Sequence, residues 1–427
     1  MQRVERRNLA VQAAVKQGLL DQDDAPLAAF VDLAGIAESV SALRSAWPDE
    51  LQVRHAFAAK ANPIVPVLRE LRKLGMSCEV ASAGELAQAR AAGFRGAELV
   101  FDSPAKSRRE LEQALAEGVA INIDNFQELA RVDDILSLRS STSDIGIRIN
   151  PQTGSGSIEA LSTASRTSKF GIALDDEGNR TTLLEAYLAR PWLRWMHVHV
   201  GSQGVPLRLT ARGVARVVEF AEEINARAGV RQVTGIDVGG GLSVNFGGDD
   251  DSPRFHDHVA ELMAAAPALF RGGYQVVTEF GRSLLAKNGF IAARVEYTKS
   301  AGGRRIAITH AGSQVAMRTT MVPEQWPLRV AAYDQLGRPR LGTPVKQDIA
   351  GPCCFAGDLV AGGRGLPLLE QGDIVTLLDT GAYYFSAPYR YNSLPEPAVH
   401  GFDLTEDGDV AFTLLRRAET VEELIGR

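Results

Sequence analysis

Polar side chains that could do chemistry recur at the ends of short apolar segments in the first part of the chain. They are Lys60, Glu79, Ser82, Asp102, Arg148, His199, Ser202, the glycine run 239–241, Glu279 and Arg282. If these segments are parallel strands, their carboxyl ends meet on one rim and face a common site. A lysine, a histidine, several carboxylates and arginines would then share that site.

The glycine run in "GIDVGGG" is the first candidate binding element. Three glycines let backbone N–H groups converge on an anion such as a phosphate, although a tight turn after a strand is the more frequent cause. The spacing lacks the third glycine of the dinucleotide fingerprint. With Ser202 and Arg282 at neighbouring strand ends, a single phosphate is the better interpretation.

Lys60 ends the apolar run "HAFAAK". Burying an ammonium costs free energy unless it is paired or used covalently, so a lysine beginning a solvated loop is the ordinary alternative. Lysine, phosphate site and carboxylate together are what pyridoxal phosphate requires: an amine for its aldehyde, an anchor for its phosphate and an acid for its ring nitrogen.

The segments that carry these residues alternate with helical patterns. Eight apolar runs read as strands: "HAFAAK", "SCEVAS", "ELVFDS", "AINIDN", "IGIRIN", "WMHVHVG", "GIDVGGG" and "VVTEFG". Between them lie segments with apolar residues at helical spacing, such as 66–74, 83–92 and 106–117. This alternation implies a parallel sheet, and eight strands are the count of a (β/α)₈ barrel. A doubly wound open sheet is the main rival.

After Gly289 the rhythm changes to strand-like runs with Gly and Pro turns and little helix. We therefore expect an α/β protein with a barrel over 27–282, for which "LAAFVDL" is a lead-in, and a mostly antiparallel C-terminal β domain over 283–427. Residues 1–26 read as a short amphipathic helix that packs on the second domain. Two polar insertions, 152–168 and 247–252, could be lids, although solvated loops are commoner.

Composition narrows the classes of partner. The chain has 427 residues and a net charge of -6, so it offers no basic footprint for nucleic acid. Three cysteines with no paired spacing do not suggest a disulfide framework. No apolar window approaches the length of a membrane span, and the first residues lack the apolar core of a signal peptide. We expect a soluble, cytoplasmic protein.

Eight motifs together resemble one family. They are "FAAKAN", "EVASAGE", "SKFGI", "HVHVGSQ", "DVGGGL", "EFGRSL", "GPCCFAGD" and "GAYYFSAPYRYNSLPEPA". From "PLAAFVDL" to "RRAETVEEL" the chain resembles the fold-type III pyridoxal-phosphate decarboxylases, which include diaminopimelate and ornithine decarboxylases, and it is nearer to the diaminopimelate branch. The resemblance implies pyridoxal 5′-phosphate as cofactor, no metal ion, an amino-acid substrate and a homodimer with shared active sites.

The resemblance also implies a role for each matched residue. Lys60 would bind the cofactor covalently, His199 would stack on its ring, and Glu279 would pair with the protonated ring nitrogen. The other cofactor-binding positions are Glu79, Arg148, Ser202, Gly240, Gly241, Arg282 and Tyr383, of which Ser202, the two glycines, Arg282 and Tyr383 would hold the phosphate. Glu79 stands where the ornithine branch has aspartate.

In "GPCCFAGD" the family's fourth residue is a cysteine that comes from the partner subunit and protonates the carbanion left after CO₂ departs. That catalytic position is Cys354, so Cys353 and Cys78 are expected to be core residues. Phe355 departs from the family, since the diaminopimelate branch has glutamate there and the ornithine branch aspartate. Each of these acids binds the distal ammonium of its substrate.

The substrate is expected to differ accordingly. A phenylalanine cannot pair with an ammonium, and leaving that charge unpaired in a closed site would cost several kcal/mol. Arg318 keeps the place of the arginine that binds a distal carboxylate, and Tyr383 is a further substrate contact, whereas Val322 replaces the expected tyrosine. Phe280, which replaces a proline, would alter only the local turn. We expect poor activity on meso-diaminopimelate.

Three alternatives stay open at this point. The chain could be a genuine diaminopimelate decarboxylase of lysine biosynthesis. It could be an amino-acid racemase on the same barrel. Racemases, however, place an arginine at the ring nitrogen, which weakens the electron sink, whereas a glutamate such as Glu279 strengthens it. A non-catalytic cofactor carrier is the third, although such carriers are normally single barrels.

Overall fold

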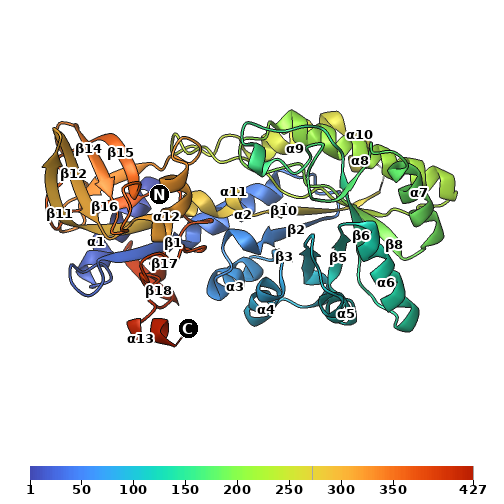
Figure 1. Ribbon diagram of the computed structural model, residues 1–427, viewed down its shortest axis with the longest axis horizontal. Helices are drawn as coiled ribbons and strands as arrows, with labels where there is room; N and C mark the ends of the chain where they lie inside the picture. The colour runs from blue at the N-terminus through green and yellow to red at the C-terminus, as the bar shows by residue number, and fades with distance from the viewer. Residues whose placement is uncertain (272, 427) are drawn as a thin grey trace. The chain divides into compact units, whose positions relative to one another are not determined.

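The computed structural model describes residues 1–271 and 273–426. The chain divides into two compact units (Figure 1). The barrel unit comprises Ser39–Val244 and Asp251–Ser283, and the β unit comprises Met1–Glu38, Asn245–Asp250 and Leu284–Arg427. The sequence predicts a barrel over 27–282 and a β domain over 283–427, with residues 1–26 packed on the β domain. In the structure residues 1–38 and 245–250 also belong to the β unit, so the chain enters this unit three times.

The barrel unit contains a closed ring of eight parallel strands among the described residues, as predicted. The strands are β2 (Val53–Ala58), β3 (Ser77–Val80), β4 (Leu99–Asp102), β5 (Ala120–Ile123), β6 (Ile145–Asn150), β8 (Leu193–His197), β9 (Gly235–Asp237) and β10 (Gln275–Phe280). They pair in chain order, and β10 returns to β2 to close the ring, whereas the short β7 (Ile172–Ala173) pairs only with β6. The open-sheet alternative is therefore wrong.

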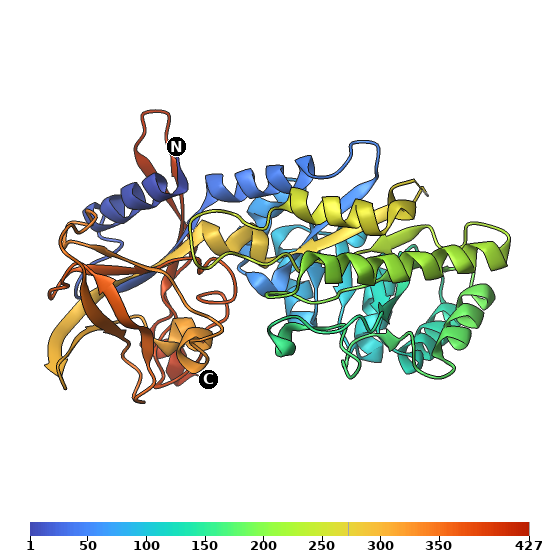
Figure 2. The ribbon, with the colours of Figure 1, turned by 90° about the horizontal axis from the view of Figure 1, so that it is seen from above.

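Helices follow the strands around this ring (Figure 1). They are α2 (Leu33–Ser45), which begins in the β unit, α3 (Val65–Lys73), α4 (Ala83–Ala92), α5 (Arg108–Ala116), α6 (Phe126–Leu138), α7 (Asn179–Ala189), α8 (Leu207–Ala228), α9 (Phe255–Ala265), α10 (Pro267–Arg271) and α11 (Arg282–Leu285). Figure 2 shows α8, in green, alongside α9, in yellow. Val214, Val217, Ala221 and Ile224 of α8 recur every three or four residues and are buried, as in an amphipathic helix on a sheet.

One indole side chain packs among the strands of the barrel. Trp195 packs with Ala56, Val100, Ala120 and Val277, whose small or branched side chains leave room for it. Glycines in the neighbouring strands serve the same purpose: a Cβ at position 235 would lie 2.2 Å from the Trp195 ring, and one at position 146 would lie 2.7 Å from its carbonyl oxygen. The indole is thus accommodated inside the barrel by small residues on the strands around it.

The β unit is built on a mixed, mostly antiparallel sheet. Its strands are β1 (Leu27–Asp32), β11 (Gly289–Ala301), β12 (Arg304–Thr309), β13 (Val330–Tyr333), β14 (Val345–Ala350), β15 (Leu359–Leu366), β16 (Ile374–Leu377), β17 (Ala398–Leu404) and β18 (Val410–Arg416), and its helices are α1 (Arg3–Lys16), α12 (Ser313–Met321) and α13 (Val421–Ile425). The sheet order is β15-β14-β12-β11-β1-β17-β18, with β16 pairing β11 and β13. Among the described strand pairs of this sheet, only β1–β17 and β12–β14 are parallel.

The "LAAFVDL" strand lies in this sheet and not in the barrel. β1 pairs antiparallel with β11 and parallel with β17. Ala10, Val11 and Ala14 of α1 are buried in one cluster with Phe30 of β1 and Phe290 of β11. The N-terminal amphipathic helix thus covers the β sheet with its apolar face. Among the described residues, no helix is both long and apolar enough to cross a membrane.

The acidic insertion after the glycine run is held by cations of the β unit. Arg329 Nη1 lies 2.7 Å from Asp249 Oδ1, and its other nitrogens bind both oxygens of Asp379 at 2.9 Å. Lys287 Nζ donates to the carbonyl oxygen of Gly248 at 2.6 Å. These contacts anchor residues 248 and 249 of the 247–252 insertion. The negative charge of Asp249 is balanced by the Arg329 cation.

Candidate functional site

Lys60 lies where β2 ends, in the 3₁₀ turn Ala59–Ala61. Its Nζ is 2.7 Å from Glu79 Oε2, and the Lys60 side chain is 42% exposed while that of Glu79 is fully buried. Burial raises the pKa of Glu79 to about 7, even though the Lys60 cation lowers it. The strand ends thus present a reachable amine with a buried acid behind it.

The glycine run and His199 form one compact element. The Gly240 N–H donates to His199 Nδ1 at 3.1 Å, so this nitrogen carries no proton and the imidazole is neutral. Burial, with the Arg148 and Lys60 cations, holds the pKa of His199 well below its usual value. The glycine is therefore used to orient the histidine ring.

Each glycine of the run is required by close approach. A Cβ at position 239 would lie 2.7 Å from His199 Nδ1, one at 240 would lie 2.2 Å from the Glu279 carbonyl oxygen, and one at 241 would lie 2.0 Å from the Gly201 carbonyl oxygen. The last glycine also has a φ of 105°, which other residues rarely adopt. This packing brings together the segments that carry His199, Ser202 and Glu279.

Glu279 and Arg282 lie at the end of the last barrel strand and just after it. Both side chains are buried, Glu279 at the end of β10 and Arg282 at the first position of α11. Burial, with Glu79 and Asp102 nearby, raises the pKa of Glu279 to about 8. A cation brought to Glu279 would lower this pKa and ionise the acid.

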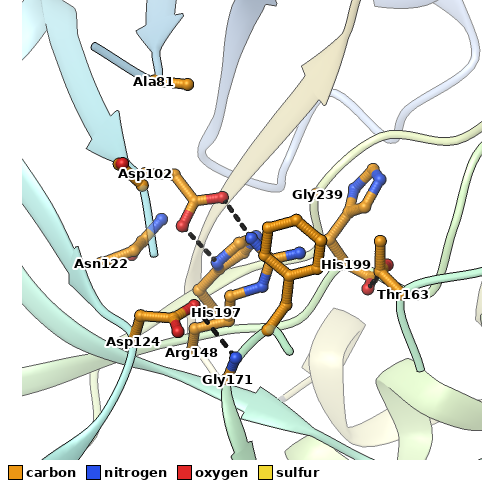
Figure 3. A network of polar contacts seen from close by, with 12 residues as sticks. Ala81, Asp102, Asn122, Asp124, Arg148, Thr163, Gly171, His197, His199 and Gly239 are labelled. Atoms are coloured by element: carbon orange, nitrogen blue, oxygen red, sulfur yellow. Dashed lines mark hydrogen bonds and ion pairs between the residues drawn. The ribbon is translucent and has the colours of Figure 1, made fainter. Parts of the chain in front are cut away.

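Arg148 is held by an acid of the neighbouring network (Figure 3). Its Nη1 lies 2.7 Å from Asp102 Oδ2, and its guanidinium lies 4.5 Å above the Phe170 ring. Burial would raise the pKa of Asp102, but Arg148 and His197 hold it below its usual value. Arg148 is thus fixed by an ion pair and an aromatic ring, the latter from the "SKFGI" motif.

The polar insertion 152–168 is tied to the segment that carries His199. The N–H groups of Thr163 and Ala164 donate to the Val200 carbonyl oxygen at 3.0 and 3.1 Å, and the Thr163 hydroxyl donates to that of His199. Figure 3 shows Thr163 beside His199. The insertion is therefore anchored, and Thr163 supports the histidine backbone.

In the β unit, the two adjacent cysteines differ. Cys354 is exposed, and its N–H donates to Asn392 Oδ1 at 2.7 Å. Cys353 is buried with Sγ 3.7 Å from Gln314 Oε1, and burial raises its pKa to about 11. Cys78, in β3 of the barrel unit, is also buried, and its pKa is raised well above the usual value. Accessibility singles out Cys354 as the cysteine that could meet a substrate.

Asp358, which sequence reasoning did not select, fixes the "GPCCFAGD" turn. Its carboxylate accepts from the Ser313 N–H at 2.6 Å, the Ser313 hydroxyl at 2.8 Å and the Cys353 N–H at 2.7 Å. A Cβ at Gly312 or Gly351 would come within 2.4 or 2.3 Å of the same carboxylate. One buried acid thus joins the cysteine turn to the start of α12, which carries Arg318.

Replacing Asp358 by alanine should lower the free energy of unfolding by about 3 kcal/mol or more, because three buried donors lose their acceptor. Urea denaturation of the purified variant measures this loss. The matched control is Asp407→Ala, an exposed aspartate of the same unit, whose unfolding free energy should change by less than about 0.5 kcal/mol. Equal stabilities of the two variants would contradict the role of Asp358.

The expected substrate residues lie among aromatic rings. Phe355 packs edge-on against Tyr391 with ring centroids 5.5 Å apart, and Tyr389 stacks on Tyr391 at 5.8 Å. The Arg318 guanidinium lies 4.7 Å from the Tyr383 ring and 5.3 Å from the Trp326 ring.

The Arg318 guanidinium also has an unused donor. Its Nη1 is buried and has no hydrogen-bond partner in the part of the chain that the structure describes. A guanidinium held between two rings with an unused donor is suited to bind a planar anion.

The predicted site residues are divided between the units. Lys60, Glu79, Arg148, His199, Ser202, Gly240, Gly241, Glu279 and Arg282 lie in the barrel unit, and Arg318, Cys354, Phe355 and Tyr383 in the β unit. Sequence reasoning missed the buried residues His197, Asp237 and Asn122, although His197 and Asp237 stand in the quoted motifs "HVHVGSQ" and "DVGGGL". A polar or ionisable residue in an otherwise apolar strand was the available signal.

Comparison with known proteins agrees with this geometry. The family model described as "Pyridoxal-dependent decarboxylase, pyridoxal binding domain" matches residues 33–286. Diaminopimelate decarboxylase of Pseudomonas aeruginosa is 31% identical over 370 residues, 86% of this chain and 84% of that protein. The one from Aquifex aeolicus is 27% identical over 391 residues, 91% and 88% of the two chains. The crystal structure of diaminopimelate decarboxylase from Helicobacter pylori complexed with L-lysine superposes with a TM-score of 0.82 and 25% identity, covering 96% and 98%.

Proposed function

Because the chain belongs to the pyridoxal-dependent decarboxylase family, we propose that it decarboxylates an amino acid with an acidic or neutral polar distal group, and that meso-diaminopimelate is a poor substrate. The class of enzyme follows from the family: a pyridoxal-phosphate-dependent amino-acid decarboxylase. The substrate is the proposed part. The observation that carries it is Phe355, an aromatic residue packed on Tyr391 where an acid is needed to bind a distal ammonium.

The residues of the barrel unit fit pyridoxal phosphate. The glycine run lets the segments that carry His199, Ser202 and Glu279 approach one another closely, so that these side chains come from neighbouring strand ends. Lys60 offers an exposed amine, His199 a neutral ring and Glu279 a carboxyl group whose ionisation a cation would favour. When bound, the cofactor supplies an electron sink for the negative charge left after CO₂ departs.

Residues of the barrel unit would hold the cofactor. Lys60 would bind the aldehyde carbon, His199 would face the ring, and Glu279 would accept a hydrogen bond from the ring nitrogen. The Gly240 N–H already donates a hydrogen bond to His199. We therefore expect Gly241, with Ser202 and Arg282, to contact the phosphate. Arg148, paired with Asp102, would be a polar neighbour of the cofactor.

The distal group of the substrate would be selected in the β unit. Arg318 keeps a buried donor for a carboxylate or another acceptor, held by the Tyr383 and Trp326 rings. Phe355 offers a hydrocarbon surface and no charge. A distal ammonium would lose its hydration without a partner, at a cost of several kcal/mol. Cys354, the exposed cysteine, would donate the proton that completes the amine product.

We further propose that each active site uses two chains, with Cys354 from one subunit and Lys60 from the other. Mixing inactive Lys60→Ala with inactive Cys354→Ala should then restore activity. Random exchange makes about half the dimers mixed, each with one intact site, so recovery should reach roughly a quarter of wild-type turnover. Native mass spectrometry verifies the exchange. Absence of recovery in verified mixed dimers would argue against shared sites.

The proposal is tested by measuring CO₂ release from a panel of amino acids, with the absorbance of the bound cofactor followed in parallel. Acidic and neutral polar amino acids should release CO₂ faster than lysine, ornithine and meso-diaminopimelate. Release fastest from meso-diaminopimelate would support the second candidate function, diaminopimelate decarboxylation, after which the similar proteins of Pseudomonas aeruginosa and Aquifex aeolicus are named. Racemisation of substrate without CO₂ release would support the racemase alternative.

A further inference from the structure

Asn392 contacts the backbone of Cys354 and has no part in the proposed function. Its Oδ1 accepts a hydrogen bond from the Cys354 N–H at 2.7 Å, across 38 residues of sequence. Both residues belong to the β unit, so one compact part of the chain carries the whole contact. The asparagine stands in "YRYNSLPEPA" and the cysteine in "GPCCFAGD". Two motifs far apart in sequence are thus joined at the cysteine that would donate the proton.

The cysteine turn is also held from within. The Cys353 N–H donates to Asp358 Oδ2 at 2.7 Å, and the Phe355 N–H donates to the Cys353 carbonyl oxygen at 2.8 Å. Three successive N–H groups therefore have acceptors, and Asn392 supplies the one acceptor of these three that comes from outside the turn. Because the peptide group is planar, a hydrogen bond to the Cys354 N–H also restrains the Cα from which the thiol side chain starts.

Asn392 accepts this hydrogen bond from an uncommon backbone conformation. Its φ is 53° and that of Ser393 is 51°, so two successive residues with a Cβ lie in the left-handed region. This region costs free energy for such residues, and asparagine and aspartate tolerate it best. Backbone strain of this kind persists where surrounding contacts enforce it, and it is concentrated at functional sites. An asparagine here supplies both the backbone geometry and the acceptor.

The residues next to Asn392 hold its turn against other parts of the β unit. Tyr391 packs edge-on against Phe355 with ring centroids 5.5 Å apart. The Tyr389 N–H donates to the Gln314 carbonyl oxygen at 3.0 Å. Neither contact uses the side chain of Asn392. A substitution that shortens this side chain should therefore leave the turn in place and remove one hydrogen bond.

We propose that Asn392 is a positioning residue for Cys354: its amide oxygen holds the backbone of the cysteine where the thiol can deliver a proton to the substrate. This inference rests on the proposed role of Cys354 as the proton donor. In that step the S–H bond breaks and a C–H bond of the amine product forms with the electron pair left by CO₂, and the thiolate regains a proton from water. A donor must lie within hydrogen-bond reach of the accepting atom, and a misplacement of about 1 Å can lower the rate about a hundredfold.

The first measurement follows the hydrogen bond itself. Hydrogen–deuterium exchange of the cofactor-loaded protein, resolved to single residues by mass spectrometry, reports the protection of the Cys354 N–H. Asn392→Gly keeps the left-handed backbone and removes the acceptor, so this N–H should exchange about tenfold faster. Asn392→Asp keeps the acceptor, so exchange should stay within about threefold of wild type. The matched control, Ser393→Gly, relaxes the next left-handed position without removing the acceptor and should keep wild-type exchange.

The second measurement separates positioning from folding. With the amino acid of the panel that wild type decarboxylates fastest, Asn392→Gly should lower kcat about ten- to a hundredfold and leave KM within about threefold. Asn392→Asp should restore kcat to within about fivefold of wild type, and Ser393→Gly should keep it. Urea denaturation checks the fold of each variant. If Asn392→Gly does not fold, Asn392→Ala, which also lacks the acceptor, takes its place.

The failures are distinguishable. If Cys354→Ala keeps the wild-type kcat, the proposed role of Cys354 fails. If Cys354→Ala is inactive and Asn392→Gly keeps the wild-type kcat, the inference about Asn392 is overturned. Equal losses of kcat in Asn392→Gly and Asn392→Asp overturn it as well, because the acceptor then makes no difference. So does a loss of kcat in Asn392→Gly with unchanged exchange of the Cys354 N–H.

Discussion

Lys60→Ala is expected to abolish covalent attachment of pyridoxal phosphate and to lower turnover by roughly three orders of magnitude or more. The reason is the position of Lys60, an exposed amine at the end of β2, 2.7 Å from the buried acid Glu79. Purified variant protein should lack the absorbance of bound cofactor near the edge of the visible range. Denaturing mass spectrometry after borohydride reduction should find no modified lysine.

The fold should survive this change. Without the Lys60 cation, the pKa of buried Glu79 rises further above its present value of about 7, so the acid becomes neutral instead of leaving a bare charge. The control is Lys73→Ala, an exposed lysine of α3 paired with Glu70, which should keep cofactor and activity. A cofactor still covalently bound to Lys60→Ala protein would show that another lysine is the attachment site.

Phe355→Glu is expected to raise kcat/KM on meso-diaminopimelate by about ten- to a hundredfold, since a hydrogen bond to a charged group contributes about 1.5–3 kcal/mol. The gain should be partial, because Val322 still stands where the family has tyrosine. The new carboxylate would lie beside Tyr391, which could donate a hydrogen bond to it. Steady-state rates of CO₂ release on meso-diaminopimelate measure the effect.

The matched variant is Phe355→Leu, which removes the ring without adding charge. It should leave meso-diaminopimelate as poor a substrate as it is for wild type. If Phe355→Leu and Phe355→Glu gain equally, the ring only obstructs the site, and the argument from a missing acid is wrong. If neither gains, Phe355 does not lie against the distal group.

The barrel was predictable because each of its strands has a recognisable local sequence pattern. Strands buried on both faces read as apolar runs, and the helices between them have their own period. The pairing partner of a strand is a different matter. "LAAFVDL" has the pattern of a barrel strand, but β1 joins β11 and β17, and only contacts far along the chain decide this.

The candidate site was predictable where residues end strands or stand in motifs. Lys60, His199 and Glu279 were proposed in this way, and they lie at or just after the ends of β2, β8 and β10. Asp358 and Asn392 were not, because their roles depend on hydrogen bonds to distant segments, Ser313 in one case and Cys354 in the other. Whether the insertion 152–168 is anchored or solvated was unpredictable for the same reason, because its serines and threonines suit a solvated loop equally well. The hydrogen bonds of Thr163 to the segment of His199 and Val200 show that it is anchored.

The central claim, that the distal ammonium has no partner in this enzyme, is tested most directly with two substrates that differ only in that group. 2-Aminopimelate, used as both enantiomers, keeps the chain length and distal carboxylate of meso-diaminopimelate but has hydrogen in place of the distal ammonium. Wild-type kcat/KM should be at least about tenfold higher on the better enantiomer of 2-aminopimelate, because no buried charge is left unpaired. A higher kcat/KM on meso-diaminopimelate would contradict the account and would support the alternative function, diaminopimelate decarboxylation in lysine biosynthesis.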